Sequence, residues 1–142
     1  MTIIKGIIFS ALLLSPNSLI EAVPENDHCS DSRFLPSGGL MLEGSTLAAT
    51  TETLEACGDA SRTTAPGVWF WAQGTGDNMR VSTCKIATHF DTQISVFAGN
   101  CGEALTCVGG NDDSCGVQSS FTWNSKFSQN YYIYVHGFGT ST

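Results

Sequence analysis

The sequence predicts an all-β fold, an antiparallel β-sandwich held together by disulfides. Six stretches downstream of residue 66 alternate apolar and polar residues with a period of two. Gly, Asn and Asp separate these stretches about every ten residues, as expected of short strands joined by turns. No amphipathic helical pattern interrupts them, and six cysteines are present to form the cross-links.

The first of these stretches, "GVWFWAQGTG", places Val68, Phe70 and Ala72 on one face and Trp69 and Trp71 on the other. A short stretch, "ALTCVGG", follows later in the chain. The remaining stretches and their expected core residues are "NMRVSTC" with Met79 and Val81, "DTQISVFAGNCG" with Ile94 and Val96, "SSFTWNS" with Phe121 and Trp123, and "NYYIYVHGFG" with Tyr131, Ile133 and Val135 alternating against Tyr132, Tyr134 and His136.

Residues 30–65 have a less regular pattern. We expect "GGLMLEGSTLAATTE" to hold two short strands around Gly44, and "TETLEACG" to form a brief turn or helical piece.

Residues 1–22 are predicted to be a secretory signal peptide. Lys5 precedes a short apolar run over residues 6–14, which is too short to span a bilayer, and Ala22 suits the last position before cleavage. A buried N-terminal helix is the alternative interpretation. We therefore expect an exported chain with one domain over residues 23–142 and no membrane span.

All six cysteines lie downstream of this leader, and in an exported chain an even number predicts disulfides. Zinc is a poor alternative because the chain has no C-x-x-C pair. Cys101 and Cys107 flank the short connection "CGEALTC" and could close a small loop, whereas Cys115 would tie the neighbouring acidic stretch to another segment. The full set is Cys29, Cys57, Cys84, Cys101, Cys107 and Cys115.

The formal net charge of −7 excludes some partners. The few basic residues are not clustered, so nucleic acid is not expected to bind. The acidity is compatible with calcium, with cationic partners, or with simple solubility.

The stretch "GGNDDSCG" is the main candidate for a metal site. Asn111, Asp112 and Asp113 could converge with Asp91 if the strand that begins at Asp91 lies beside this loop, and calcium prefers such oxygen ligands. The alternative is that Asn and Asp side chains cap a turn without any ion. Asp91 itself could instead be a structural anchor that accepts hydrogen bonds from a neighbouring turn.

A catalytic role is not expected. Asp112 and Asp113 are adjacent, which does not suit carboxylates that act on opposite sides of a substrate. The three histidines, His28, His89 and His136, lie far apart in the sequence, and no motif selects a nucleophilic serine. We expect these histidines at the surface or in turns.

Outward-facing aromatic residues give a second candidate site. If Phe70 and Ala72 face the core, Trp69 and Trp71 face outward together, and Tyr132 and Tyr134 do the same on their strand. Such rings could hold sugars on a sheet face. The alternative is that one set packs against the N-terminal segment or against a final strand that is missing from this chain.

Four stretches in order, "GVWFW", "FDTQISVF", "GNDDSCGVQSS" and "YYIYVHGF", resemble the bacterial pre-peptidase C-terminal (PPC) domain family in its cysteine-rich eukaryotic secreted form. The resemblance is firm from residue 66 onward and loose over residues 29–65. It implies a jelly-roll-like sandwich that assists secretion, substrate attachment or adhesion without catalysis. Members of the family continue into a final strand, whereas this chain stops at "GTST", which indicates either a fragment or a sandwich with an exposed edge.

The sequence therefore predicts a secreted, non-catalytic binding or accessory module that attaches to a polysaccharide or an extracellular protein. The alternatives are a calcium-stabilised adhesion domain and a fragment of a larger secreted hydrolase.

Overall fold

A computed structural model describes residues 2–3, 7–9 and 21–142, and its regular structure consists of strands and one short 3-10 helix. The strands are long only in the second half of the chain, where the sequence alternates. The elements are β1 (Thr2–Ile3), β2 (Ile7–Phe9), η1 (Cys29–Asp31), β3 (Arg33–Phe34), β4 (Leu42–Gly44), β5 (Gly67–Gln73), β6 (Asn78–Ser82), β7 (Thr92–Ala98), β8 (Thr106–Asp112), β9 (Ser120–Asn124) and β10 (Asn130–Gly137).

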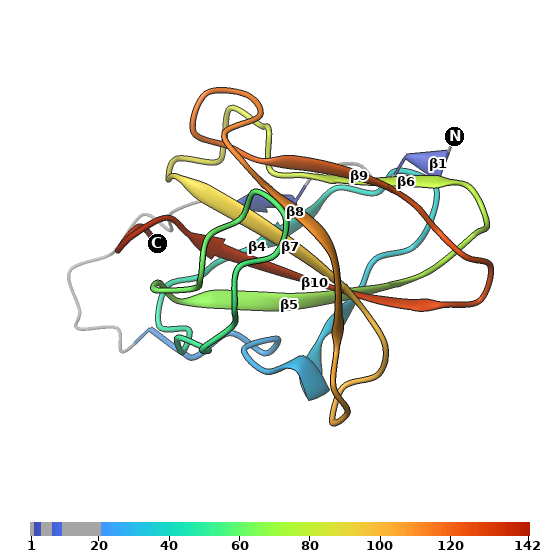
Figure 1. The fold of residues 1–142 in the computed structure, drawn as a ribbon. Helices are drawn as coiled ribbons and strands as arrows, with labels where there is room; N and C mark the ends of the chain where they lie inside the picture. Colours follow the sequence, from blue (N-terminus) through green and yellow to red (C-terminus); the bar gives the residue numbers. More distant parts are fainter. Residues whose placement is uncertain (1, 4–6, 10–20) are drawn as a thin grey trace.

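The described strands form three sheets, and two of these sheets face each other as a sandwich (Figure 1). One is five-stranded in the order β3-β5-β10-β7-β8, the other three-stranded in the order β1-β6-β9, and β2 and β4 form a separate pair. The main core fills the space between the sheets, because the inward side chains of β5, β7 and β10 meet those of β6 and β9. This arrangement confirms the predicted all-β sandwich.

The predicted alternation is confirmed strand by strand. The inward residues of the five-stranded sheet, such as Phe70, Ile94 and Ile133, are fully buried. Met79 and Trp123 supply the core from the opposite sheet and are direct cross-strand partners. Period-two patterning therefore located both the strands and the face that each buries.

The structure differs from the sequence prediction at the sheet edges. The long strands pair antiparallel, but β1 with β6, β2 with β4, and β3 with β5 are short parallel pairs. Around Gly44 the structure has one strand, β4, where two were expected, and "TETLEACG" is irregular, with only an isolated bridge between Cys57 and Ala60. Such short pairs contain too few residues to show an alternating pattern.

The second face of the five-stranded sheet is also largely covered. Two segments, residues 26–31 and 52–61, lie against it, and we call them the cover; the second passes in front of β7 and β8 in Figure 1. Cys57 joins Trp69, Phe97 and Tyr134 in a second buried cluster, on which Leu54 also packs. The sheet is therefore buried on both faces over much of its area.

Hydrogen bonds hold the cover in place. Asn26 exchanges backbone and side-chain bonds with Trp69, and Glu52 accepts a bond from the Trp69 indole nitrogen at 3.1 Å. Asp27 accepts bonds from the backbone nitrogen and the hydroxyl of Thr50, which ties the first segment of the cover to the chain just before the second segment.

The structure contains the disulfides Cys29–Cys101, Cys57–Cys107 and Cys84–Cys115, and the first two fix the cover. The small loop expected between Cys101 and Cys107 is wrong, because each of these residues instead joins one segment of the cover to the β7–β8 region. The expectation for Cys115 is confirmed, since it ties the acidic stretch to Cys84 at the end of β6.

Most of the predicted signal peptide, residues 1–22, lies outside the described residues, so its cleavage stays a prediction. Among the described residues, no helix has the length and apolar character needed to cross a membrane.

The Cys57–Cys107 and Cys84–Cys115 disulfides should differ in their effect on stability. The loops they close span 50 residues for Cys57–Cys107 and 31 for Cys84–Cys115, and loop entropy alone gives about 4 kcal/mol for either. Cys57 is also fully buried in the second cluster. We expect the double variant C57A/C107A to be about 1 kcal/mol less stable than C84A/C115A in urea unfolding. Equal stabilities would show that the cover contributes no packing.

Candidate functional site

The stretch "GGNDDSCG" spans the end of β8 and the turn that follows it. Asn111 and Asp112 are the last residues of β8, and Asp113 has a left-handed backbone with φ of 57°. The Asn111 side-chain oxygen accepts bonds from the Ser114 hydroxyl at 2.7 Å and from the Ser120 backbone nitrogen at 2.9 Å. Asn111 therefore caps the turn, as the alternative interpretation expected.

The three aspartates do converge. Asp91 immediately precedes β7, which pairs with β8, so its carboxylate reaches those of Asp112 and Asp113. One carboxylate oxygen of each lies within 4.8 Å of the others. The sequence prediction that Asp91 meets this loop is thus matched by the geometry, whereas Asn111 directs its oxygen into the turn.

Two oxygens of this acidic cluster are buried without a hydrogen-bond donor. They are Oδ1 of Asp91 and Oδ1 of Asp112. The other oxygen of Asp112, Oδ2, accepts a bond from the Gln93 amide at 2.7 Å. Since a turn donor does not reach Asp91 Oδ1, the structure does not show the anchoring role that was considered for it.

Burial raises the pKa of Asp91 above its ordinary value of 3.8, and the negative charges of Asp112 and Asp113 raise it further. The three carboxylates of the cluster therefore repel one another at neutral pH. A bound cation would relieve this repulsion and would also provide a partner for the two buried oxygens.

The donor set fits calcium. Calcium takes six to eight oxygen ligands and accepts irregular geometry, and three carboxylates leave positions for water. The ligands would be Asp91, Asp112 and Asp113, without Asn111. An ion held there would join the start of β7 to the β8–β9 turn.

A buried polar row continues from the cluster across the sheet. Gln93 bonds both Asp112 and the Ser61 hydroxyl, and its cross-strand neighbour on β10 is His136. Burial lowers the pKa of His136, although its contact with the Gly137 carbonyl and the charge of Asp112 oppose this shift. The expectation that His136 lies at the surface or in a turn is wrong, because it sits fully buried in β10.

The four aromatic residues predicted to hold sugars share one sheet face, but they do not form one exposed platform. Trp69 and Tyr134 are 1% and 0% exposed beneath the cover. Burial raises the pKa of Tyr134 to about 12. Trp71 and Tyr132, which are cross-strand partners, remain half-buried at the edge of the covered area.

Phe34 extends this accessible part, although it was not among the aromatic residues predicted from the sequence. Its ring lies 4.7 Å from that of Trp71, at an interplanar angle of 44°, and its side chain is 48% exposed. Gln73 and Asn130, which also pair across strands, lie two positions along from Trp71 and Tyr132 on the same face. Strand β3 has only two residues, so no periodic signal marked Phe34.

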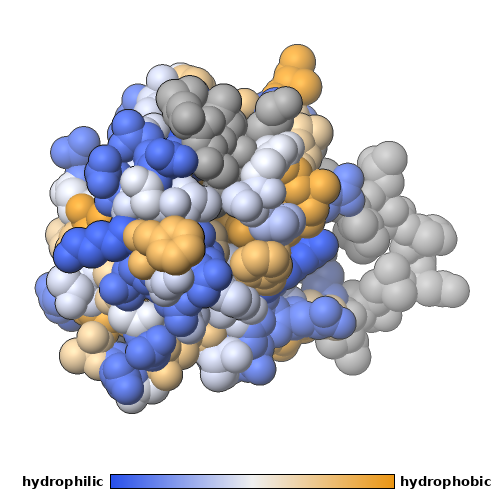
Figure 2. Space-filling view, turned by 90° about the vertical axis from the view of Figure 1, so that its right-hand side faces the viewer, coloured by the Kyte–Doolittle hydropathy of each residue, from blue (hydrophilic) through white to orange (hydrophobic). Residues whose placement is uncertain are grey.

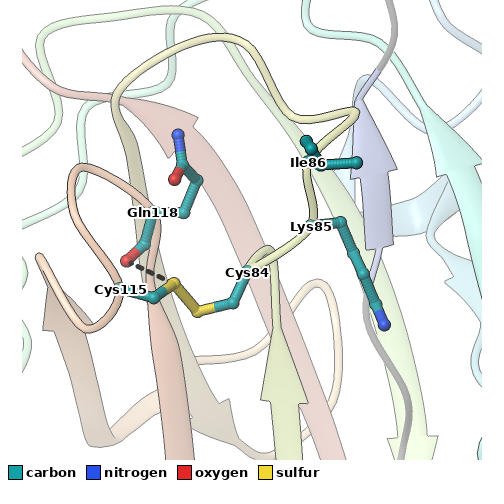
Figure 3. Close-up of a pocket in the computed structure, with 5 residues that line it drawn as sticks. All are labelled: Cys84, Lys85, Ile86, Cys115 and Gln118. Atoms are coloured by element: carbon teal, nitrogen blue, oxygen red, sulfur yellow. Dashed lines mark hydrogen bonds between the residues drawn. A yellow bond between two sulfur atoms is a disulfide. The ribbon is translucent and has the colours of Figure 1, made fainter.

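Two other surfaces are weaker candidates for a ligand site. The end of the molecule with the β5–β6 and β9–β10 connections is mostly hydrophilic, and its hydrophobic residues lie in small separate groups (Figure 2). Figure 3 shows a pocket of about 250 Å³ beside the Cys84–Cys115 disulfide, lined also by Lys85, Ile86 and Gln118. With one charged side chain in its wall, this pocket does not select a ligand.

Comparison of the chain with protein-family models, with curated proteins and with solved structures found no match. The function is therefore inferred from the geometry of the chain.

The electrostatic repulsion within the acidic cluster can be tested in the absence of any metal. A raised pKa in the folded state means that Asp91 contributes most to stability below pH 3.8 and that this contribution is lost as the pH rises through its folded pKa. In chelator at pH 7, we expect Asp91→Asn to stabilise the protein by on the order of 1 kcal/mol. The gain should shrink toward pH 3.

The exposed Asp77 provides a matched control, and Asp77→Asn should leave the free energy of unfolding unchanged within about 0.5 kcal/mol. If Asp91→Asn instead lowers stability at pH 7 in chelator, the carboxylate is a structural anchor and not a source of repulsion.

Proposed function

We propose that the chain is an extracellular, non-catalytic binding module that attaches to a polysaccharide. The observation that carries this proposal is the accessible aromatic pair of Phe34 and Trp71 at the edge of the covered sheet face. Three disulfides support an extracellular location, since such cross-links persist in oxidising compartments. The resemblance to PPC domains supports an accessory role.

The surroundings of the pair suit a sugar chain. Aromatic rings offer flat apolar surfaces for the C–H faces of sugar rings. Gln73 is exposed and Asn130 half-buried beside them, and their amides can exchange hydrogen bonds with hydroxyl groups. The net charge of −7 disfavours sulfated or carboxylated polymers, so a neutral polysaccharide is the target we infer.

Because Trp71 is half-buried and belongs to neither buried cluster, its ring can be removed with limited loss of core packing. We expect Trp71→Ala to weaken binding to the polysaccharides that the wild-type chain retains by roughly tenfold or more, in line with central aromatic contacts. The measurement is a glycan array followed by titration of the retained oligosaccharides.

Phe127→Ala is the matched control, because Phe127 is 80% exposed but lies in the β9–β10 connection. Its binding should equal that of the wild type. Equal weakening by both variants, or none by Trp71→Ala, would refute the assignment of the site.

A second candidate function is a calcium-stabilised adhesion domain. The two buried carboxylate oxygens without donors, on Asp91 and Asp112, favour it. In this function calcium would fix the β8–β9 turn, which the Cys84–Cys115 disulfide also constrains, and would hold the loops at that end of the sandwich in one arrangement for a partner.

Calcium at 100 times its dissociation constant should stabilise the oxidised protein by about 2.7 kcal/mol, which raises the melting temperature by roughly 5–10 °C. Asp113→Asn is the matched variant, because Asp113 is exposed and asparagine tolerates its left-handed backbone. We expect this variant to melt no lower than the wild type in chelator, because it removes one of the repelling charges, and to lose much of the calcium shift. Identical melting curves with calcium and with chelator would exclude the site.

A further inference from the structure

A pocket of about 380 Å³ lies on the covered face of the five-stranded sheet, apart from both sites described above. One wall is the first half of the cover's second segment, with Leu54, Glu55 and Ala56, and the other is the stretch that leads into β8, with Glu103 and Leu105. The Cys57–Cys107 disulfide joins the two walls directly beyond the pocket. The cross-link fixes their separation, so the pocket exists before a ligand arrives.

The floor of the pocket is apolar. Phe97 is 7% exposed at its base, and Leu54 and Leu105 are half-buried against the same cluster. Because Phe97 is almost covered, it offers no free ring face for stacking. The floor is suited to a narrow aliphatic group, which would displace water from these side chains.

The rim carries negative charge from both walls. The Glu55 side chain is 83% exposed and has only a surface ion pair with Arg62, at 3.5 Å. Glu103 is exposed and accepts a bond from the Asn100 amide at 3.3 Å. In the described part of the chain, no lysine or arginine lies within ion-pair distance of Glu103, and none lines the pocket.

We propose that this pocket binds a lysine side chain of an extracellular protein partner. The four-carbon stem of lysine would cover the apolar floor while its ammonium group stays at the charged rim. Lysine fits better than arginine, because a compact point charge can serve one carboxylate on each wall, whereas a planar guanidinium favours two bonds to one carboxylate. The net charge of −7 attracts a basic partner.

This site is separate from polysaccharide attachment and does not depend on it. The module could then bind a basic protein at this pocket while the aromatic pair of Phe34 and Trp71 contacts a sugar chain.

The experiment is a ¹H–¹⁵N NMR titration of the oxidised protein with Nα-acetyl-lysine-N-methylamide. We expect shifts confined to the backbone amides of residues 53–56, 97 and 103–107, with saturable binding that weakens in high salt. The Nε-acetylated form of the same probe keeps the stem and removes the charge. It should bind at least fivefold more weakly, and equal binding of the two forms would overturn the proposal.

Substitutions of the charged residues test the role of the rim in binding. Glu55→Gln and Glu103→Gln should each weaken binding roughly threefold, the scale of an exposed ion pair, and Arg62→Gln should strengthen it by freeing Glu55. Glu43→Gln, an exposed glutamate on β4, makes the same charge change away from the pocket and should have no effect. Equal effects of all three glutamate variants would overturn the site.

Butylammonium, which has the stem and charge without a peptide backbone, distinguishes the source of the ligand. Comparable affinity for butylammonium and the lysine probe supports a side chain presented by a protein. Butylammonium binding tenfold more tightly would show that the rim excludes a peptide backbone, and would overturn the assignment of a protein partner.

Discussion

The cover over one face of the five-stranded sheet is the constraint on which the accessible surfaces of the molecule depend. Residues 26–31 and 52–61 bury Trp69 and Tyr134, and two disulfides, Cys29–Cys101 and Cys57–Cys107, hold these segments against the β7–β8 region. Without the cover, a large aromatic surface would face water. With it, the margin at Phe34 and Trp71 and the pocket beside Phe97 remain accessible on that face.

Much of the sandwich could be predicted from the sequence, because its long strands bury one face against the opposite sheet and therefore alternate. Phe70, Ile94 and Ile133 are examples of residues that this pattern placed correctly. The convergence of Asp91 with Asp112 and Asp113 was also predictable, since each lies at the end of a strand. Asn111 was predicted as a ligand, yet its contacts are with the turn.

The rest depends on contacts between distant residues that leave no local pattern. Phe34 reaches Trp71 through a strand of two residues, and the cover has no regular structure apart from one short 3-10 helix and one bridge. The disulfide pairing followed the path of the cover and not the spacing of Cys101 and Cys107. His136 is fully buried although it lies on the strand face that period-two reasoning treats as the outer one.

Two disulfides cross-link the cover to the β7–β8 region, and disulfide mapping tests these cross-links most directly. Non-reducing proteolysis and mass spectrometry of the oxidised protein should recover peptides that join Cys29 to Cys101, Cys57 to Cys107 and Cys84 to Cys115. A peptide that joins Cys101 to Cys107 would contradict the account, because neither segment of the cover could then be held as described.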